Sequence, residues 1–335
     1  MGHLFEGVWR EDALTNDERG RFLRQASKFH NWITADGSPG PSGEGGFAAE
    51  AGRYHLYISL ACPWAHRTLI FRKLKQLEDV ISLSVVDPIM GADGWVFSDA
   101  PGTIPDLAEG KSRLSEIYLL TNPKYTGRVT VPTLWDKKKK TIVNNESSEI
   151  IRMFNSAFDA LTPVRTDYYP QELRPAIDKI NALVYENVNN GVYRAGFATT
   201  QEAYEEAFGS LFAMLDRLED ILSRQRYLVG NRLTEADWRL FTTLVRFDAV
   251  YHGHFKCNLR RIDDYPNLSN YLRDLYQVPG VAETVNLDHI KRHYYGSHRK
   301  LNPSGIVPLG PALDFATEHD RARFETVRPT RVRAS

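Results

Sequence analysis

The chain of 335 residues has little cysteine, no excess of charge of either sign and no long apolar run. Its two cysteines, Cys62 and Cys257, are too few for a disulfide framework and favour a reducing compartment. Lysine plus arginine and aspartate plus glutamate both total 42, and a net charge of zero argues against nucleic acid as the main partner. No stretch approaches the ~18 apolar residues of a membrane-spanning helix, and the first residues lack the apolar segment of a signal peptide. We therefore predict a cytoplasmic protein without membrane spans.

The chain nevertheless has enough apolar residues for a folded core. Hydrophobic residues make up 42% of it, with 16 tyrosines and 16 phenylalanines, so global disorder is excluded. At about 150 residues per domain, the length predicts two domains. We expect an N-terminal extension over residues 1–50, an α/β domain over 51–160, an all-helical domain over 170–302 and a C-terminal tail over 303–335. We expect this tail to be loosely ordered; its arginines are Arg321, Arg323, Arg328, Arg331 and Arg333.

The α/β domain begins with an alternation of strand and helix. Residues 54–60 are β-branched and aromatic and predict a strand, as do residues 80–86. Between them, apolar residues at helical spacing predict a helix over 64–77, and Pro63 suits its first turn. A strand, helix and strand in this order predict two parallel strands joined by a right-handed crossover.

A turn-rich insertion over residues 87–127 follows, with one short helix predicted around 112–120. Residues 129–135 and 141–143 then predict a hairpin. We interpret the four lysines at 137–140 as a solvated turn that protects a sheet edge. A helix is expected to open near Glu146, and its buried residues are Ile150, Ile151, Phe154 and Phe158.

From about residue 170 the apolar spacing is helical throughout. The longest stripe of apolar residues predicts an amphipathic helix, and Thr234 with Asp237 predicts a capped helix start. The predicted helices cover residues 172–189, 201–224, 234–250 and 266–276.

Cys62 lies where the first strand passes into the first helix. A thiolate there faces the free N–H groups of the helix and the positive end of its dipole, which we expect to lower the thiol pKa. The second thiol of a Cys-x-x-Cys pair would be at position 65, which is Ala65, so a dithiol shuttle is excluded. A single reactive thiol forms a mixed disulfide with an external thiol, and a second external thiol must release it. The alternative is a small buried side chain without chemistry.

Two further features suggest a site for a short peptide. If the Val131–Pro132 bond is cis, the Val131 backbone N–H and C=O are free to pair with an extended ligand. Glu146 and Ser147 open a helix whose N–H groups can take a carboxylate, and Glu146 can take an ammonium. Glutathione has both groups and a thiol between them. Each feature alone also occurs as ordinary fold architecture.

A metal site is the alternative use of the second cysteine. His252, His254 and Cys257 are metal-ligand types at close spacing, but no fourth ligand is near in the sequence. We therefore predict no metal and interpret Cys257 as an inert buried thiol.

Five segments together resemble the glutathionyl-hydroquinone reductases, the Xi class of glutathione transferases, which are related to the omega class. The resemblance spans residues of about 40 to 305. The segments are Ser59-Leu-Ala-Cys-Pro-Trp-Ala-His-Arg67, Asp93-Gly-Trp-Val-Phe97, Gly191-Val-Tyr-Arg-Ala-Gly-Phe-Ala198, Tyr251-His-Gly-His-Phe-Lys-Cys-Asn258 and His293-Tyr-Tyr295. The resemblance implies a thioredoxin-like N-terminal domain, a helical C-terminal domain and a homodimer.

The resemblance also implies a reaction and its residues. Cys62 matches the nucleophile, Tyr193 the proton donor, and Tyr251 and Tyr294 the tyrosines that line the substrate pocket. The residues that match glutathione contacts are Trp95, Arg128, Val131, Glu146 and Ser147. The implied reaction removes glutathione from S-glutathionyl-hydroquinones through a mixed disulfide on Cys62, giving hydroquinone and glutathione disulfide. Because carbon is a poor leaving group, a proton must be supplied as the bond breaks.

Two other functions use the same fold. An omega-like thioltransferase or dehydroascorbate reductase needs Cys62 but not the three tyrosines. A non-catalytic binding module needs no reactive thiol at all. A transferase that conjugates glutathione is disfavoured, because such enzymes usually activate it through serine or tyrosine.

Overall fold

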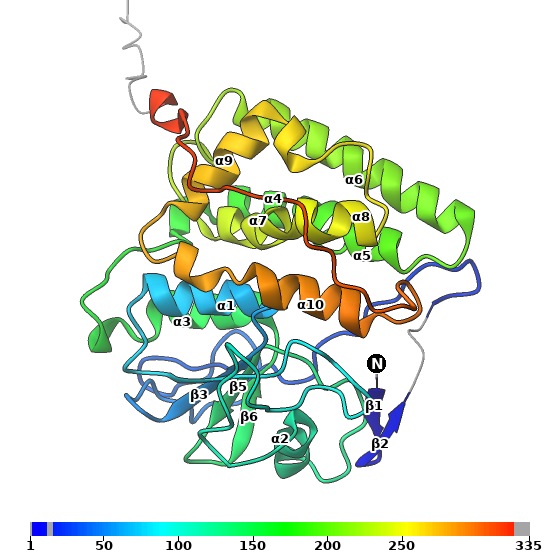
Figure 1. The fold of residues 1–335 in the computed structure, drawn as a ribbon. Helices are drawn as coiled ribbons and strands as arrows, with labels where there is room; N and C mark the ends of the chain where they lie inside the picture. Colours follow the sequence, from blue (N-terminus) through cyan, green and yellow to red (C-terminus); the bar gives the residue numbers. More distant parts are fainter. Residues whose placement is uncertain (1, 12–15, 325–335) are drawn as a thin grey trace, which may run out of the picture.

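The computed structural model describes residues 2–11 and 16–324. Figure 1 shows two halves, with a sheet and its helices below and a stack of helices above. Helices α1 and α3 of the lower half and α10, near the end of the chain, lie between the sheet and the upper helices. The boundary between the two halves is therefore made largely of helices.

The lower half is built on a four-stranded mixed sheet in the order β4-β3-β5-β6. Strands β3 and β4 are parallel, as predicted, with Tyr57 opposite Ser84, and β5 and β6 form the predicted antiparallel hairpin. The elements are β3 (Tyr54–Ile58), α1 (Pro63–Leu74), β4 (Ser82–Val85), α2 (Leu114–Thr121), β5 (Thr133–Asp136), β6 (Thr141–Asn144) and α3 (Ser147–Ser156). The sequence predicted each of them within a few residues.

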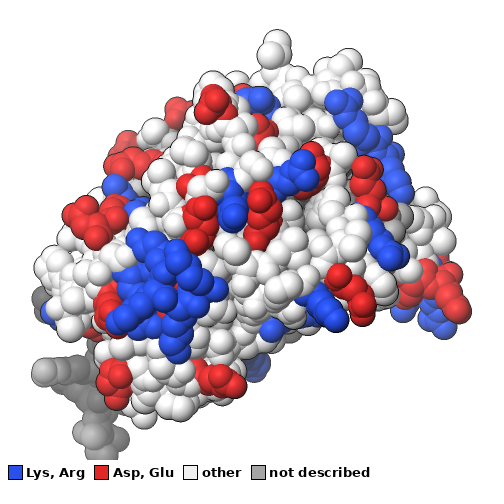
Figure 2. Space-filling view, turned by 90° about the horizontal axis from the view of Figure 1, so that it is seen from below, with Lys and Arg blue, Asp and Glu red and all other residues white. Residues whose placement is uncertain are grey.

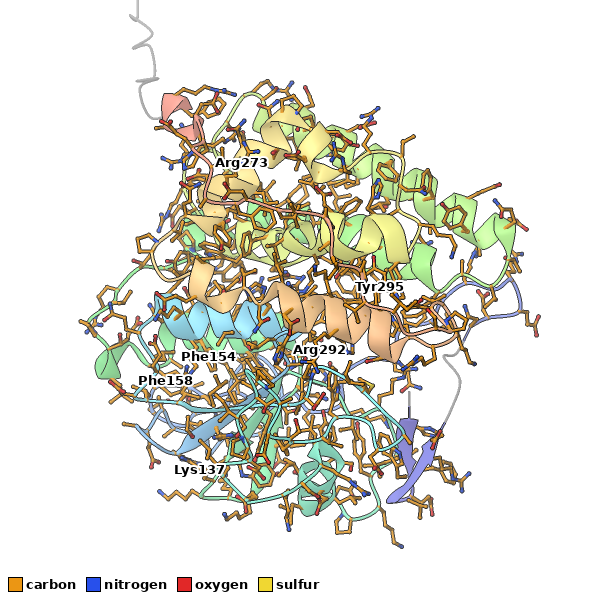
Figure 3. The ribbon with its side chains drawn as sticks, viewed as in Figure 1. Lys137, Phe154, Phe158, Arg273, Arg292 and Tyr295 are labelled. Carbon is orange, nitrogen blue, oxygen red and sulfur yellow. The ribbon has the colours of Figure 1, made fainter. Side chains whose placement is uncertain are left out.

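The core of this half lies between the sheet and the layer of α1 and α3. Every residue of β3 is buried, which fits an interior strand between two neighbours. Phe154 and Phe158 lie in the space between helices and sheet in Figure 3 and meet edge to face, with ring centres 6.1 Å apart. Phe158 also meets Tyr54 of β3 edge to face. Burial of these rings joins α3 to the sheet.

The upper half is all helical. Its helices are α4 (Arg174–Val184), α5 (Gly191–Gly196), α6 (Gln201–Leu222), α7 (Glu235–Arg246), α8 (His252–His254), α9 (Pro266–Tyr276) and α10 (Leu287–Ser297). Two π-helical turns, Tyr185–Asn189 and Phe247–Tyr251, continue α4 and α7. Thr234 and Asp237 form the predicted capping box at the start of α7.

Helix α10 was not predicted. Its side chains join the upper half to the insertion after β4. His293 pairs with the carbonyl of Pro88 at 2.9 Å, the Met90 N–H donates to Ser297 Oγ at 2.9 Å, and His289 pairs with the carbonyl of Pro101 at 2.7 Å. In Figure 3, Tyr295 lies on the side of α10 that faces the upper helices. The helix therefore holds the long insertion against the rest of the molecule.

The N-terminal extension contains a hairpin that was also not predicted. Strands β1 (Gly2–Phe5) and β2 (Val8–Glu11) are antiparallel. Leu4 exchanges two backbone hydrogen bonds with Gly127, at 2.9 and 2.8 Å. The hairpin is thus attached to the end of the 87–127 insertion.

The expectation of a loosely ordered tail is wrong for residues 303–324. Arg321 is fully buried and donates to the carbonyls of Leu222, Gln225 and Arg226 at 2.8, 2.6 and 2.6 Å. Proline and arginine spacing gave no sign of this, because the contact depends on carbonyl groups left free where α6 ends. Arg328, Arg331 and Arg333 lie outside the described residues.

Lys and Arg are interspersed with Asp and Glu over much of the surface. On the face seen in Figure 2, which looks onto the sheet half, basic side chains gather in one patch. The lysines 137–140 form the predicted turn beside β6, the edge strand of the sheet. Two of them pair with acids, Lys138 with Glu50 and Lys140 with Glu109. Among the described residues, no helix is long and apolar enough to cross a membrane.

Candidate active site

Cys62 caps the first helix of the sheet half. Pro63 takes the first position of α1, and the Ala65 N–H donates to Cys62 Sγ at 3.5 Å. The Val131–Pro132 bond is cis, and Cys62 Sγ lies 3.5 Å from the Val131 carbonyl oxygen. This corrects the expectation that the Val131 C=O is free, because the Cys62 thiol donates to it. The junction of β3 and α1 and the segment that leads into the β5–β6 hairpin therefore meet at the Cys62 sulfur.

The expected lowering of the Cys62 pKa is wrong. Cys62 is only 8% exposed, and burial raises the pKa of its thiol above the ordinary value. The N–H groups of Ala65 and Trp64 and the charges of Arg246 and Arg24 oppose this rise without overcoming it. The sequence predicted the helix N-terminus correctly but not the depth at which it is buried.

A buried arginine of the upper half, Arg246, binds the backbone just before Cys62. Arg246 of α7 donates to the carbonyls of Leu60 and Ala61 at 3.0 and 2.9 Å, immediately before Cys62 in the chain. It also contacts His66 Nδ1 at 2.9 Å. Arg246 thus fixes the backbone at the start of α1 and brings a positive charge near the sulfur.

A pocket of about 140 Å³ opens over Cys62. We call it the Cys62 pocket. Six of the predicted site residues line it: Cys62, Trp95, Arg128, Val131, Tyr193 and Tyr294. Its other lining residues include Phe22, Arg24, Trp64, Met90, Phe197, His293 and His298. A larger cavity of about 540 Å³ shares Met90, Phe197 and His298 with it, so the two adjoin.

Three tyrosine hydroxyls lie close together near Cys62: Tyr193 and Tyr294 line the Cys62 pocket, whereas Tyr251, which was expected to line it too, is fully buried. The Tyr294 hydroxyl lies 2.5 Å from that of Tyr193 and 3.0 Å from that of Tyr251. These residues come from α5, the π-helical turn after α7, and α10. We call them the tyrosine chain. A proton lost from Tyr193 leaves a phenolate that can accept a hydrogen bond from Tyr294, which can accept one from Tyr251.

The tyrosine chain has one member best placed to give up a proton. Burial raises the pKa of Tyr251 and Tyr294 well above the ordinary value. Burial and the nearby Cys62 also raise the pKa of Tyr193, while Arg24 and the hydrogen bond with Tyr294 oppose the rise. Tyr193 lines the pocket with Cys62 and has the Arg24 guanidinium over its ring, so it is the member we assign as proton donor.

Trp95 and Arg128 flank the pocket on the side of the sheet half. Trp95 is buried and its ring stacks on that of His293, with centres 5.0 Å apart. Burial lowers the pKa of His293 to about 4, so this stack is neutral at neutral pH. Arg128 also lines a second hollow of about 70 Å³, which reaches Ser27 and Asn145.

Glu146 and Ser147 lie beyond this hollow, at the start of α3. Glu146 caps the helix, accepting from the Ser148 N–H at 3.0 Å and from the Ser27 hydroxyl at 3.1 Å. Although burial raises the pKa of Glu146, the bonds from Ser148 and the charge of Arg67 hold it below its ordinary value. The Ser147 hydroxyl lies 3.4 Å from Arg67 Nη1. A carboxylate and a helix N-terminus thus lie side by side, and the Glu146 carboxylate itself accepts one of the N–H groups of that helix start.

Cys257 and the nearby His254 lie in contacts that do not form a metal site. Cys257 is fully buried, and burial raises the pKa of its thiol. His254 pairs with His298 at 3.2 Å. Within residues 2–11 and 16–324, no group of three or more histidine, cysteine, aspartate or glutamate side chains could hold a metal ion.

Several residues of the Cys62 pocket were not predicted from the sequence. Arg24 belongs to a polar N-terminal segment without regular pattern, so nothing in the sequence placed it near Cys62. His298 lies just after α10, a helix that was not predicted. Trp64 was inside the quoted Cys62 segment, and its position two residues after the thiol is the one signal that could have revealed it.

Comparison with known families agrees with this architecture. The family described as glutathione S-transferase, N-terminal domain, matches residues 61–157. The family described as glutathione S-transferase, C-terminal domain, matches residues 201–274. The first match covers Cys62, the hairpin and α3, and the second covers α6, α7 and most of α9.

Individual proteins match over nearly the whole chain. The glutathionyl-hydroquinone reductase YqjG of Escherichia coli (strain K12) is 59% identical over 96% of this chain and 98% of its own length. The glutathionyl-hydroquinone reductase PcpF of Sphingobium chlorophenolicum is 58% identical over 93% and 97%. The glutathione-bound structure of YqjG superposes with a TM-score of 0.89 at 57% identity, covering 96% of this chain and 99% of that one. A Xi-class transferase from Natrialba magadii gives a TM-score of 0.89 at 51% identity, covering 96% and 97%. The chain therefore belongs to the glutathione S-transferases and, among them, to the Xi-class glutathionyl-hydroquinone reductases.

Proposed function

We propose that this chain is a glutathione-dependent reductase that removes glutathione from S-glutathionyl-hydroquinones. The observation that carries the proposal is that a single thiol at a helix start shares one pocket with Tyr193 and Tyr294, the first two members of the tyrosine chain. The thiol suits attack on a sulfur, and a tyrosine suits proton donation to a carbon that leaves.

In the first step, the Cys62 thiolate attacks the sulfur of the glutathionyl group. A Cys62–glutathione disulfide forms, the bond between sulfur and ring carbon breaks, and its electron pair stays on the carbon. Tyr193 protonates that carbon, and the hydroquinone leaves. The reaction depends on the deprotonated fraction of Cys62, which the α1 N–H groups, Arg246 and Arg24 increase against the effect of burial.

In the second step, the thiolate of a free glutathione attacks the mixed disulfide. Glutathione disulfide leaves, and the Cys62 thiolate is restored. The proton released from this glutathione balances the one that Tyr193 gave up. No second thiol of the chain can do this, because Cys257 is buried in the upper half.

The proposed glutathione site runs from Cys62 to the start of α3. The thiol end lies at Cys62 and Val131, flanked by Trp95 and Arg128, and the γ-glutamyl end lies at Glu146 and Ser147. The support is that the Cys62 pocket and the adjoining hollow share Arg128 and Thr130. The helix N-terminus suits the carboxylate, and Glu146 suits the ammonium.

The test is mass spectrometry of the protein after incubation with a glutathionylated hydroquinone. We expect a glutathione adduct on Cys62 and one released hydroquinone per adduct. Cys62→Ala should lose turnover. If wild-type protein releases hydroquinone without a Cys62 adduct, or Cys62→Ala keeps its activity, the thiolate mechanism is wrong.

Substitution of Tyr193, the proposed proton donor, distinguishes hydroquinone release from simple thiol transfer. Tyr193→Phe should slow hydroquinone release by about 10²-fold but leave reduction of a small mixed disulfide nearly unchanged, because a thiolate leaves without a proton. Tyr295→Phe is the matched control, since its hydroxyl bonds to the Ala249 carbonyl. Equal losses on both substrates in Tyr193→Phe would favour the thioltransferase.

We also propose a homodimer in a reducing, cytoplasmic compartment. The reaction consumes reduced glutathione, and the protein's two thiols are both unpaired. Light scattering coupled to size-exclusion chromatography tests the assembly: a dimer mass is expected, and a monomer mass at all concentrations would contradict it.

A further inference from the structure

Arg24 reaches the Cys62 pocket from the N-terminal extension. The segment before it is attached to the upper half: Asn16 donates to the Phe197 carbonyl at 2.8 Å, and Arg21 pairs with Glu206 of α6 at 2.6 Å. Figure 1 shows this segment rising past the ends of α5 and α6. Its course delivers Arg24 to the pocket wall, beside Tyr193.

The Arg24 guanidinium lies over three aromatic rings, those of Phe22, Trp64 and Tyr193. Its centre lies 4.9 Å from the ring centre of Trp64 and 4.7 Å from that of Tyr193. Its Nε donates to Asn190 Oδ1 at 2.7 Å, which fixes the plane of the group. Asn190 lies directly before α5, the helix of Tyr193. Arg24 and Tyr193 are thus oriented by the same stretch of chain.

One nitrogen of this guanidinium has no partner. Arg24 Nη2 is buried and has no hydrogen-bond partner among the described residues. A buried N–H donor without an acceptor is destabilising, and a buried cation more so. An unpaired buried cation in the wall of a reactive pocket is expected where the anion that pairs with it forms only during the reaction.

We propose that Arg24 is a positioning residue that acts through Tyr193, holding its ring by a cation–π contact and stabilising the phenolate that remains after proton transfer. This inference rests on the proposed function, since it assigns a task to the acid of that reaction. It also gives the N-terminal extension a part in the chemistry.

The charges around Tyr193 support this role. The titratable and charged groups that act on Tyr193 are Cys62 of the α1 start, Tyr294 of α10, Tyr251 after α7 and Arg24 of the extension, which lies over its ring. Cys62 as a thiolate opposes a phenolate on Tyr193, and the two other tyrosines are neutral. Of these four groups, Arg24 alone is positive. It opposes the rise in the Tyr193 pKa that burial and Cys62 cause.

The experiment is a double-mutant cycle in the full-length protein, with Arg24→Met, Tyr193→Phe and both together. The rate of hydroquinone release is measured in a single turnover with a glutathionylated hydroquinone. Arg24→Met should slow release roughly tenfold, less than the loss of a direct oxyanion donor. In Tyr193→Phe it should slow release less, because only the effect of Arg24 on the Cys62 thiolate remains. Arg24→Lys should restore part of the rate, because it keeps the charge.

A spectroscopic titration gives a readout that is independent of turnover. The difference in tyrosinate absorbance between each protein and its Tyr193→Phe counterpart reports the pKa of Tyr193. Arg24→Met should raise this pKa. The control Arg21→Met removes a cation from the same extension, whose ion pair with Glu206 lies outside the pocket, and should leave both pKa and rate unchanged. Asn190→Ala, which removes only the bond to Nε, should have a smaller effect than Arg24→Met.

The outcomes separate the two proposals. If the wild type releases no hydroquinone, the proposed function fails and this inference with it. If the wild type is active and Tyr193→Phe is slow, but Arg24→Met is as fast as wild type, the role of Arg24 alone is overturned. Equal slowing by Arg24→Met in both backgrounds, with no shift in the Tyr193 pKa, overturns it too and indicates that Arg24 acts through Cys62 or anchors the extension.

Discussion

At the scale of single residues, the two cysteines show that burial can outweigh local hydrogen bonds. Both are buried, but Cys62 has N–H donors and two arginines near its sulfur, whereas Cys257 has Lys256 as the one nearby group that lowers its pKa. The helix N-terminus moderates the Cys62 pKa without reversing the effect of desolvation. The Cys62 thiolate is therefore the minority form of this side chain in the isolated protein at neutral pH.

The reactivity of Cys62 should rise with pH. Alkylation by iodoacetamide requires the thiolate, and a pKa above the ordinary value of about 8.5 means that the rate climbs by about tenfold per pH unit from about pH 6 to beyond about pH 8. Peptide mass spectrometry over this range measures it, and Cys257 should stay unmodified in the folded protein. A rate that levels off below about pH 7 would show that the helix N-terminus wins over burial.

At the scale of elements, prediction succeeded where the pattern is local. Strand β3, helix α1 and the β5–β6 hairpin follow from β-branched and aromatic residues, from Pro63 and from turn residues, and Cys62 could be placed from them. Helix α10 is as long as α9, which was predicted, but its segment contains several histidines and tyrosines whose burial depends on partners far along the chain, so its apolar face was not recognisable. Tyr193, Tyr251 and Tyr294 could be selected only through the family resemblance, because their meeting depends on three distant segments.

The cap of α10 should matter more for hydroquinone release than for thiol exchange. The Asn286 side chain accepts from the His289 N–H at 2.9 Å, and Asn286→Ala should cost about 1 kcal/mol of stability. Because α10 carries Tyr294 and holds the insertion at Pro88, the variant should slow hydroquinone release, as measured in a single turnover. Reduction of a small mixed disulfide, which needs Cys62 on α1, is the control and should change less. The same loss on both substrates would show that α10 has no special link to the acid step.

At the scale of the whole molecule, the two halves are joined by buried polar groups around α1. Arg246 of α7 bonds to Leu60 and Ala61, Arg67 of α1 donates to Asn189 Oδ1 at 2.8 Å, and His66 pairs with Thr284 at 2.8 Å. Such bonds have fixed directions, so they set the position of the upper half over Cys62 more strictly than apolar contact alone.

Arg246→Met should destabilise the whole molecule. It leaves buried carbonyls of Leu60 and Ala61 without their donor, and we expect a loss of more than about 2 kcal/mol in the free energy of unfolding. Urea denaturation measures this as a lower midpoint. Arg224→Met is the matched control, because its ion pair with Asp220 is exposed and should contribute less than about 0.5 kcal/mol. Equal stability of the two variants would mean that the halves are held together by apolar packing.

The depth of Cys62 also has a consequence for the range of thiols that the protein can exchange with. Cys62 is 8% exposed and lines a pocket with aromatic rings from both halves of the chain. A thiol on the surface of a folded protein has less access to such a sulfur than a tripeptide thiol has. We therefore expect a mixed disulfide on Cys62 to exchange with glutathione faster than with protein thiols.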